Sequence, residues 1–141
     1  AMALRLVLPH ASVVTPNLPE LQRLTASELS SAQQIQALRE YTQADILVKG
    51  GHGVATEDVN NQWWDQSGLR QSWCWPRLAG EFHGSGCTLA AALAGQLANG
   101  RKLADALELA QVYTQACLTE ACRIAEGQLI PRRFHTQDAL R

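Results

Sequence analysis

The first half of the chain contains two short runs of apolar, β-branched residues with a helical stretch between them. Residues 11–15 and 45–49 have the composition of strands that are buried on both faces of a parallel sheet. Pro16 ends the first run, and Asn17 can cap a helix over residues 18–24. This order predicts a βαβ unit with a right-handed crossover.

A second helix is expected in the same connection. Ser30 or Ser31 can act as its N-cap, and apolar side chains then recur at the spacing of one helix face, at Ile35, Leu38 and Tyr41.

The middle of the chain is more polar and holds all four tryptophans. The segments 61–65 and 69–75 flank the turn signal 66–68, which predicts an antiparallel hairpin at one edge of the sheet. The aromatic side chains fit cross-strand packing, and a ligand-stacking cluster is the alternative. They are Trp63, Trp64, Trp73 and Trp75.

Two helices are predicted in the last third of the chain. One follows a glycine-rich loop and ends at about Ala98, with Gly100 just past its end. The other runs from Leu103 to about Arg123, with one apolar face. That face comprises Leu103, Ala106, Leu107, Ala110, Tyr113, Cys117, Ala121 and Ile124.

Composition narrows the class of protein. With 141 residues, 46% hydrophobic residues and a formal charge of −1, residues 1–141 are expected to form one domain. The near-neutral charge argues against a nucleic-acid partner. No run of eighteen apolar residues or signal-peptide pattern occurs, so we expect a cytoplasmic protein without a membrane partner. The cysteine spacing suggests neither a zinc site nor a disulfide framework.

The glycine-rich loop is the strongest candidate for chemistry. Gly84, Ser85 and Gly86 run directly into an apolar helix, whose first N–H groups and dipole attract anions. Glycines let the backbone approach a phosphate closely. Cys87 falls in the first helical turn, where this field favours the thiolate. An ordinary glycine-rich helix entry with a buried cysteine is the alternative.

The sequence 83–92, His-Gly-Ser-Gly-Cys-Thr-Leu-Ala-Ala-Ala, resembles the signature of the hydroxymethylpyrimidine/phosphomethylpyrimidine kinases, which belong to the ribokinase-like superfamily. Three further segments, 13–20, 47–52 and 127–133, resemble the same family in the same order. The resemblance covers the carboxyl-terminal half of such an enzyme. It implies a three-layer α/β fold with a mostly parallel sheet, an antiparallel edge hairpin and helices on both faces.

The resemblance also implies roles for residues at the phosphates. The amides of the Gly84 loop would hold the transferred phosphate, and Cys87 would accept the proton of the attacking hydroxyl. Asn17 and Glu20 match the motif with which the superfamily holds Mg²⁺ and its waters. An N-cap with an acid in the first turn is the alternative for this pair.

Lys49 matches the lysine of the family segment that lies near the ATP phosphates, and a solvated lysine at a strand end is the alternative. Gly50 and Gly51 follow it in a turn at the carboxyl end of a strand, where α/β proteins bind ligands. We therefore expect all three residues to contact the cofactor. His52 and His83 are assigned no chemical role.

The implied reaction is ATP-dependent phosphorylation of hydroxymethylpyrimidine and its monophosphate in thiamine biosynthesis. A pyridoxal-type kinase and a non-catalytic nucleotide-binding module are the alternatives. Since the family recognises the pyrimidine mainly through its amino-terminal half, no contacts with the substrate ring can be assigned. We expect the strand at residues 12–15 to expose an unpaired edge that favours self-association or pairing with the missing half.

Overall fold

The structure is a computed structural model that describes residues 6–25, 29–51, 58–124 and 126–134. Contacts divide the chain into two compact units, Ala1–Arg77 and Leu78–Arg141. The single-domain organisation expected from the sequence stays a prediction.

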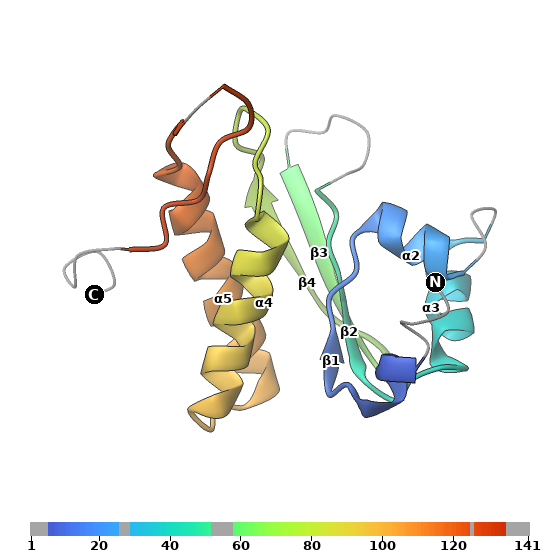
Figure 1. Ribbon diagram of the computed structural model, residues 1–141. Coiled ribbons are helices and arrows are strands. Elements are labelled where there is room, and N and C mark those ends of the chain that lie inside the picture. The colour runs from blue at the N-terminus through green and yellow to red at the C-terminus, as the bar shows by residue number, and fades with distance from the viewer. Residues whose placement is uncertain (1–5, 26–28, 52–57, 125, 135–141) are drawn as a thin grey trace. The chain divides into compact units, whose positions relative to one another are not determined.

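The first unit contains a four-stranded sheet in the order β1-β2-β3-β4 (Figure 1). The strands are β1 (Val13–Val14), β2 (Asp45–Val48), β3 (Asp58–Asp65) and β4 (Gly68–Pro76). β1 and β2 are parallel, as predicted, whereas β2–β3 and β3–β4 are antiparallel. The α/β class and the edge hairpin are confirmed. The sheet of this chain is mixed and not mostly parallel, because the hairpin supplies two of its four strands.

Two helices connect β1 to β2 and cover one face of the sheet. The helices α2 (Leu18–Leu24) and α3 (Ser31–Arg39) begin as the sequence predicts, with Asn17 and Ser30 as N-caps of reciprocal capping boxes. The short 3₁₀ helix η1 (Leu8–His10) precedes β1. Burial of one large apolar side chain stabilises the folded state by about 1.5–3 kcal/mol. A small core with side chains from all of these elements is therefore enough to hold them together. That core consists of Leu8, Leu21, Ile35, Leu38, Ile46 and Val48.

The hairpin is longer than the sequence pattern indicates. Strand β3 begins at Asp58 and not at residue 61, and β4 ends at Pro76 and not at residue 75. Its turn falls at residues 66–67, and Gly68 follows with φ of 125°. Trp63 Nε1 donates a hydrogen bond of 2.8 Å to Asp45 Oδ1, Trp64 packs against the apolar core, and Trp73 is buried. These contacts are those expected of aromatic packing on a sheet.

The second unit is built on two helices that pack against each other, α4 (Ser85–Ala98) and α5 (Leu103–Thr119) (Figure 1). Gly100, with φ of 77°, donates to the carbonyl of Leu97, and Arg101 donates to that of Gln96. This pair of bonds is a Schellman motif and confirms the predicted end of α4. The buried apolar side chains are Leu89, Leu93, Ala106, Leu107, Ala110 and Cys117.

The predicted end of α5 at about Arg123 is wrong, because the helix ends at Thr119. Cys122 instead pairs with Ile130 in an antiparallel bridge, with N–H···O distances of 3.1 and 2.9 Å in the two directions. Ile124, expected on the buried face, is 74% exposed. Residues 126–134 form the tail of the described chain. Backbone pairing with this tail takes the place of the last helical turn that the sequence predicts.

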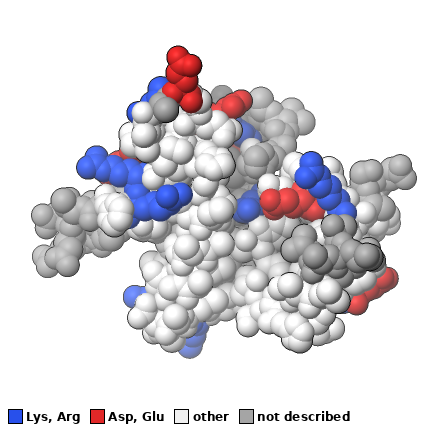
Figure 2. Space-filling model, in the orientation of Figure 1, with Lys and Arg blue, Asp and Glu red and all other residues white. Residues whose placement is uncertain are grey.

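Charged side chains are scattered on the face of the molecule that Figure 2 shows, with wide uncharged areas between them. Among the helices that the structure describes, none has the length and apolar character needed to cross a bilayer.

Candidate functional site

The glycine loop of the second unit leads into α4 through a left-handed residue. Gly84 is the N-cap of the helix and has φ of 87° and ψ of 9°, a conformation that strongly favours glycine. Its carbonyl accepts the N–H of Thr88 at 2.9 Å and also the Thr88 hydroxyl at 2.9 Å. These two bonds fix the loop on the first turn of the helix.

The first turn of α4 leaves its N–H groups available. No side chain of the described residues caps this helix, and its first turn contains no acidic residue. The backbone amides of Ser85, Gly86 and Cys87 precede the first helical hydrogen bond, which Thr88 donates. The structure thus brings together the predicted loop residues in a geometry that suits an anion. Cys87 itself is exposed and not buried.

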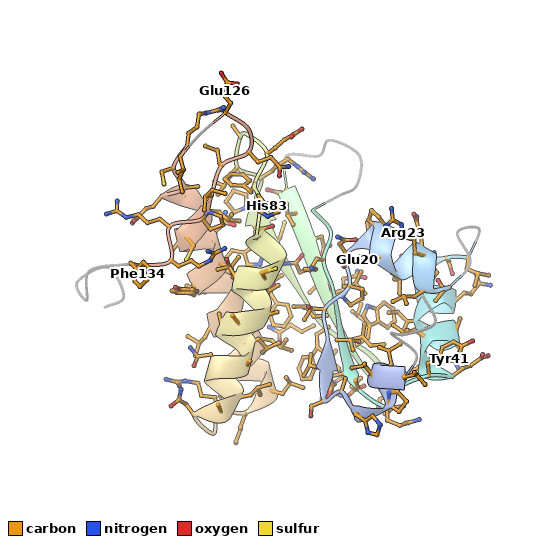
Figure 3. All side chains as sticks on the ribbon, viewed as in Figure 1. Glu20, Arg23, Tyr41, His83, Glu126 and Phe134 are labelled. Atoms are coloured by element: carbon orange, nitrogen blue, oxygen red, sulfur yellow. The ribbon has the colours of Figure 1, made fainter. Side chains whose placement is uncertain are left out.

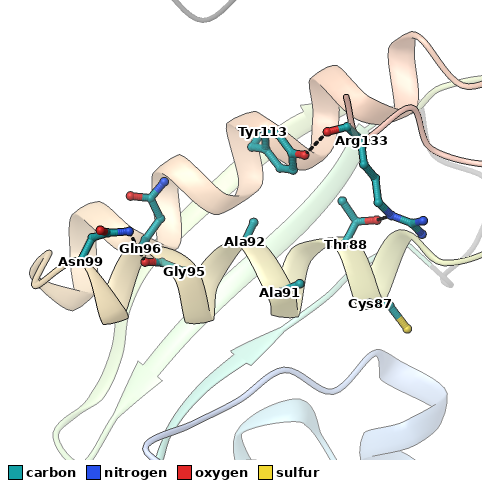
Figure 4. A pocket seen from close by; sticks show the side chains of 9 residues that line it. All are labelled: Cys87, Thr88, Ala91, Ala92, Gly95, Gln96, Asn99, Tyr113 and Arg133. Carbon is teal, nitrogen blue, oxygen red and sulfur yellow. Dashed lines mark hydrogen bonds between the residues drawn. The ribbon is translucent and has the colours of Figure 1, made fainter. Parts of the chain in front are cut away.

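Arg133, a residue that the sequence analysis assigned no role, lies beside this loop. Its Nε donates a hydrogen bond of 3.0 Å to Thr88 Oγ1 (Figure 4). A Cβ atom added to Gly84 would lie 2.7 Å from Arg133 Nη2, so the guanidinium passes close to the loop backbone. Glycine at position 84 permits this approach.

The tail that carries Arg133 is held by several contacts within its unit. Leu129 donates to the carbonyl of Glu81 at 2.7 Å and accepts the N–H of His83 at 2.9 Å. Arg132 donates through its backbone to Cys117 O at 2.9 Å, and the Tyr113 hydroxyl donates to Arg133 O at 2.6 Å. In the sequence, the resemblance of residues 127–133 to the kinase family is the only sign that the tail folds back to the glycine loop.

An open pocket of about 700 Å³ follows α4 from its first turn (Figure 4). Cys87, Thr88 and Arg133 line the end near the glycine loop, and Tyr113 contributes from α5. The remaining lining residues are Ala91, Ala92, Gly95, Gln96 and Asn99. Burial raises the pKa of the Tyr113 phenol above 10.0, and its side-chain interaction with Cys117, in which the phenol is the donor, is the next cause. The phenol therefore stays protonated near neutral pH and donates to the tail.

The predicted metal and cofactor residues of the first unit gather at the carboxyl ends of β1 and β2. Asn17 and Lys49 form a parallel bridge, and Lys49 N donates to Pro16 O at 2.9 Å. Asn17 Oδ1 accepts from Glu20 N, and Glu20 Oε2 accepts from Asn17 N, both at 2.8 Å. This is a complete capping box at the start of α2, where Figure 3 labels Glu20. Glu20 is exposed, so its second carboxylate oxygen can still hold a hydrated cation.

The two glycines after Lys49 differ in their surroundings. A Cβ on Gly50 would lie 2.1 Å from the carbonyl oxygen of Asn60, whereas one on Gly51 would meet only Val59 Cγ1 at 3.9 Å. Gly50 N also donates to Asn61 Oδ1 at 3.1 Å. Gly50 is therefore required by the close approach of β3, a structural need that exists without any cofactor.

Two histidines, His52 and His83, lie near the motifs in the sequence. His83 is exposed in the loop that precedes α4, as Figure 3 shows. His52 lies outside the described residues. Among the residues that the structure does describe, no three His, Cys, Asp or Glu side chains are grouped closely enough to hold a metal ion.

The model of the phosphomethylpyrimidine kinase family matches residues 1–131. The chain belongs to this family. It is 31% identical over 128 residues to a hydroxymethylpyrimidine/phosphomethylpyrimidine kinase from Haemophilus influenzae. The matched region covers 86% of this chain and 48% of that protein. It is 34% identical over 124 residues to the thiamine biosynthesis bifunctional protein ThiED from Geobacter sulfurreducens, covering 84% of this chain and 25% of that protein.

The fold resembles that of a solved kinase. An ADP complex of Bacillus subtilis pyridoxal kinase matches with a TM-score of 0.81 and 24% identity, covering 94% of this chain and 52% of that chain. This similarity confirms the ribokinase-like fold. The chain spans about half the length of the kinases that it matches.

Proposed function

We propose that this chain is the phosphate-binding part of a kinase that transfers the γ-phosphoryl group of ATP to hydroxymethylpyrimidine and to its monophosphate in thiamine biosynthesis. The observation that carries the proposal is the uncapped start of α4, with its left-handed Gly84 and three available amides, in a member of the phosphomethylpyrimidine kinase family. Phosphoryl transfer depends mainly on positioning and on neutralising charge, and both are tasks of such a loop.

In the proposed reaction the amides of Ser85, Gly86 and Cys87 donate hydrogen bonds to the oxygens of the migrating phosphoryl group. Fixed amide donors need no reorganisation as charge develops there. The substrate hydroxyl forms a bond to the γ-phosphorus while the bond to the bridging oxygen of ADP breaks. We assign acceptance of its proton to Cys87, which is exposed in the first turn of the helix.

We propose that Glu20, with Asn17, holds Mg²⁺ through its water shell. The free carboxylate oxygen of Glu20 fits this task, since Mg²⁺ keeps several waters and needs few protein carboxylates. When bound, the ion would neutralise charge on the nucleotide phosphates. Lys49, beside Asn17 in the backbone pairing, would add a positive charge from the same unit, and Gly50 and Gly51 would contribute backbone contacts with the cofactor.

The pyrimidine is favoured over pyridoxal as substrate because the family model and the curated relatives are those of phosphomethylpyrimidine kinases. The similarity to pyridoxal kinase, at 24% identity, concerns the fold alone. We assign recognition of the ring to the half of the relatives that this chain does not span. A cytoplasmic location stays a prediction.

The proposal is tested by placing a negative charge at the first residue of α4. Ser85→Asp should abolish ATP binding by repulsion of the γ-phosphate, yet leave the fold at least as stable, since an acid in the first turn gains about 0.3–1 kcal/mol from the helix dipole. Ser85→Asn is the matched neutral control and should retain binding. Calorimetric titration with ATP and thermal melting measure the two effects. Equal ATP affinity in Ser85→Asp and the unaltered chain would refute the assignment of the phosphate site.

A further inference from the structure

The Arg133 guanidinium is a positive charge without an acidic partner among the residues that the structure describes. Nε donates to Thr88 Oγ1, a neutral acceptor, at 3.0 Å. Among the described parts of the chain, the ion pair found is that of Arg70 with Asp65, and no carboxylate pairs with Arg133. The guanidinium has five N–H donors in a planar fork, and the Thr88 bond uses one.

This charge lies where an isolated cation is unfavourable. The start of a helix carries partial positive charge, which attracts anions and repels cations. Because the first turn of α4 contains no acid, nothing in that turn compensates Arg133. An anion bound at the helix start would interact favourably with both the amides and the guanidinium.

Contacts within the tail keep Arg133 in this position. The Tyr113 hydroxyl holds the Arg133 carbonyl at 2.6 Å, and the backbone of Arg132 is bonded to Cys117 O at 2.9 Å. At the other end, Gly84 leaves room for Nη2, which a Cβ would approach to 2.7 Å. The side chain is thus anchored at its backbone and at Nε, with its outer nitrogens directed at the loop.

The open pocket gives a ligand access to this position. Arg133 lines it together with Cys87 and Thr88 at the first turn of α4 (Figure 4). A phosphate that bound the loop amides would therefore lie close to a solvent-accessible guanidinium.

We propose that Arg133 is a phosphate ligand of the α4 loop, donating from its Nη nitrogens to oxygens of the group that the loop amides bind. This inference rests on the proposed function. A planar fork matches the geometry of phosphate oxygens better than a lysine ammonium does. Arg133 would hold the phosphate from the side of the tail, whereas the amides hold it along the helix axis.

The test compares two neighbouring arginines in the full 141-residue chain. Arg133→Gln should weaken ATP binding about tenfold, equivalent to ~1.4 kcal/mol, and should lower the dependence of binding on salt. Arg132→Gln removes the same charge one residue away and should change ATP affinity less than about twofold. Arg133→Lys should fall between the unaltered chain and Arg133→Gln, since it keeps the charge and loses the fork.

The outcomes separate this inference from the function on which it rests. If the unaltered chain binds ATP and Arg133→Gln binds it equally well, Arg133 is no ligand, although the phosphate loop stands. An equal loss in Arg132→Gln and Arg133→Gln would also overturn the inference, because only net charge would then matter. If the unaltered chain binds no ATP, both the loop assignment and the role of Arg133 fail. Thermal melting of each variant excludes unfolding, and Arg133→Lys decides the case if Arg133→Gln melts early.

Discussion

Cys87 is exposed in the third position of α4, where the helix start favours a negative charge. The other three cysteines lack this combination. Cys117 is fully buried, and desolvation raises the pKa of its thiol. Desolvation and, after it, the neighbouring Asp58 raise the pKa of the Cys74 thiol. Cys122 is exposed, but it follows the negative end of α5.

We therefore expect iodoacetamide to modify Cys87 first at neutral pH, because the thiolate is the reacting form. Bound ATP should slow this reaction. Mass mapping of the alkylated peptides measures the order, and alkylation of the unfolded chain in urea provides the control for access. Preferential labelling of Cys122 in the folded chain would remove the physical basis for Cys87 as the proton acceptor.

Alanine substitutions at Gly50 and Gly51 test how closely the backbone of β3 approaches Gly50. Gly50→Ala places a Cβ 2.1 Å from the Asn60 carbonyl oxygen, and this backbone cannot yield as a flexible side chain can. We expect a loss of about 1–3 kcal/mol in the free energy of unfolding, the usual cost of overpacking.

Gly51→Ala is the control, since its Cβ would make only an ordinary contact at 3.9 Å. Urea unfolding of both variants gives the comparison. Equal stability of the two variants would show that β3 does not approach Gly50 as closely as described.

Helix α5 carries the buried thiol of Cys117, and the backbone carbonyl of the same residue accepts the N–H of Arg132 in the tail. Burial raises the pKa of Cys117 above its ordinary value of 9.0. Above pH 9.0 the unfolded chain loses this proton while the folded chain retains it, so the unfolded state is favoured as pH rises. The stability that depends on a neutral Cys117 is therefore fully present at neutral pH and is lost in alkaline solution.

We expect the free energy of unfolding to fall between neutral pH and about pH 10, and Cys117→Ala to reduce this fall. Cys122→Ala, which changes an exposed cysteine, should leave the fall nearly as it is in the unaltered chain. Urea unfolding at both pH values measures the difference. An undiminished pH dependence in Cys117→Ala would show that the thiol is not the group responsible.

The elements that the sequence predicts best are those with strong local signals. Asn17 and Ser30 mark the starts of α2 and α3 through their own capping geometry, and Gly100 marks the end of α4. The periodic apolar pattern continues past Thr119 and therefore predicts a longer α5, whereas the backbone of Cys122 pairs with Ile130. Such pairing depends on a distant segment, so the local pattern cannot predict it.

The same reason explains which part of the site could be predicted. The glycine loop is local, so the sequence predicts both its helix start and its available amides. Arg133 reaches the loop only through the return of a polar tail, held by Tyr113 and Leu129. No periodicity indicates that return. For the pair Asn17 and Glu20, the capping box confirms the structural role, and the metal role stays a prediction.

At the scale of the whole molecule, the chain spans about half the length of its relatives. β1 forms one end of the sheet order in the described residues, so its outer edge has no strand partner among them. Unpaired strand edges favour pairing with another chain. We expect self-association of the isolated chain, which analytical ultracentrifugation over a range of concentrations would detect. A strictly monomeric chain at every concentration would contradict this expectation.

We propose that the phosphate-binding part of a kinase is present here and that orientation of the pyrimidine comes from the half of the relatives that this chain does not span. Orientation can supply about 7–11 kcal/mol of barrier reduction, so its loss should remove nearly all turnover. The most direct measurement is release of ADP with hydroxymethylpyrimidine and ATP, by the 141 residues alone and joined to the amino-terminal half of the Haemophilus influenzae kinase. We predict turnover by the joined protein, its loss in Cys87→Ala, and none by the 141 residues alone. Robust turnover by the monomeric 141 residues, or none by a folded joined protein that binds ADP, would contradict the claim.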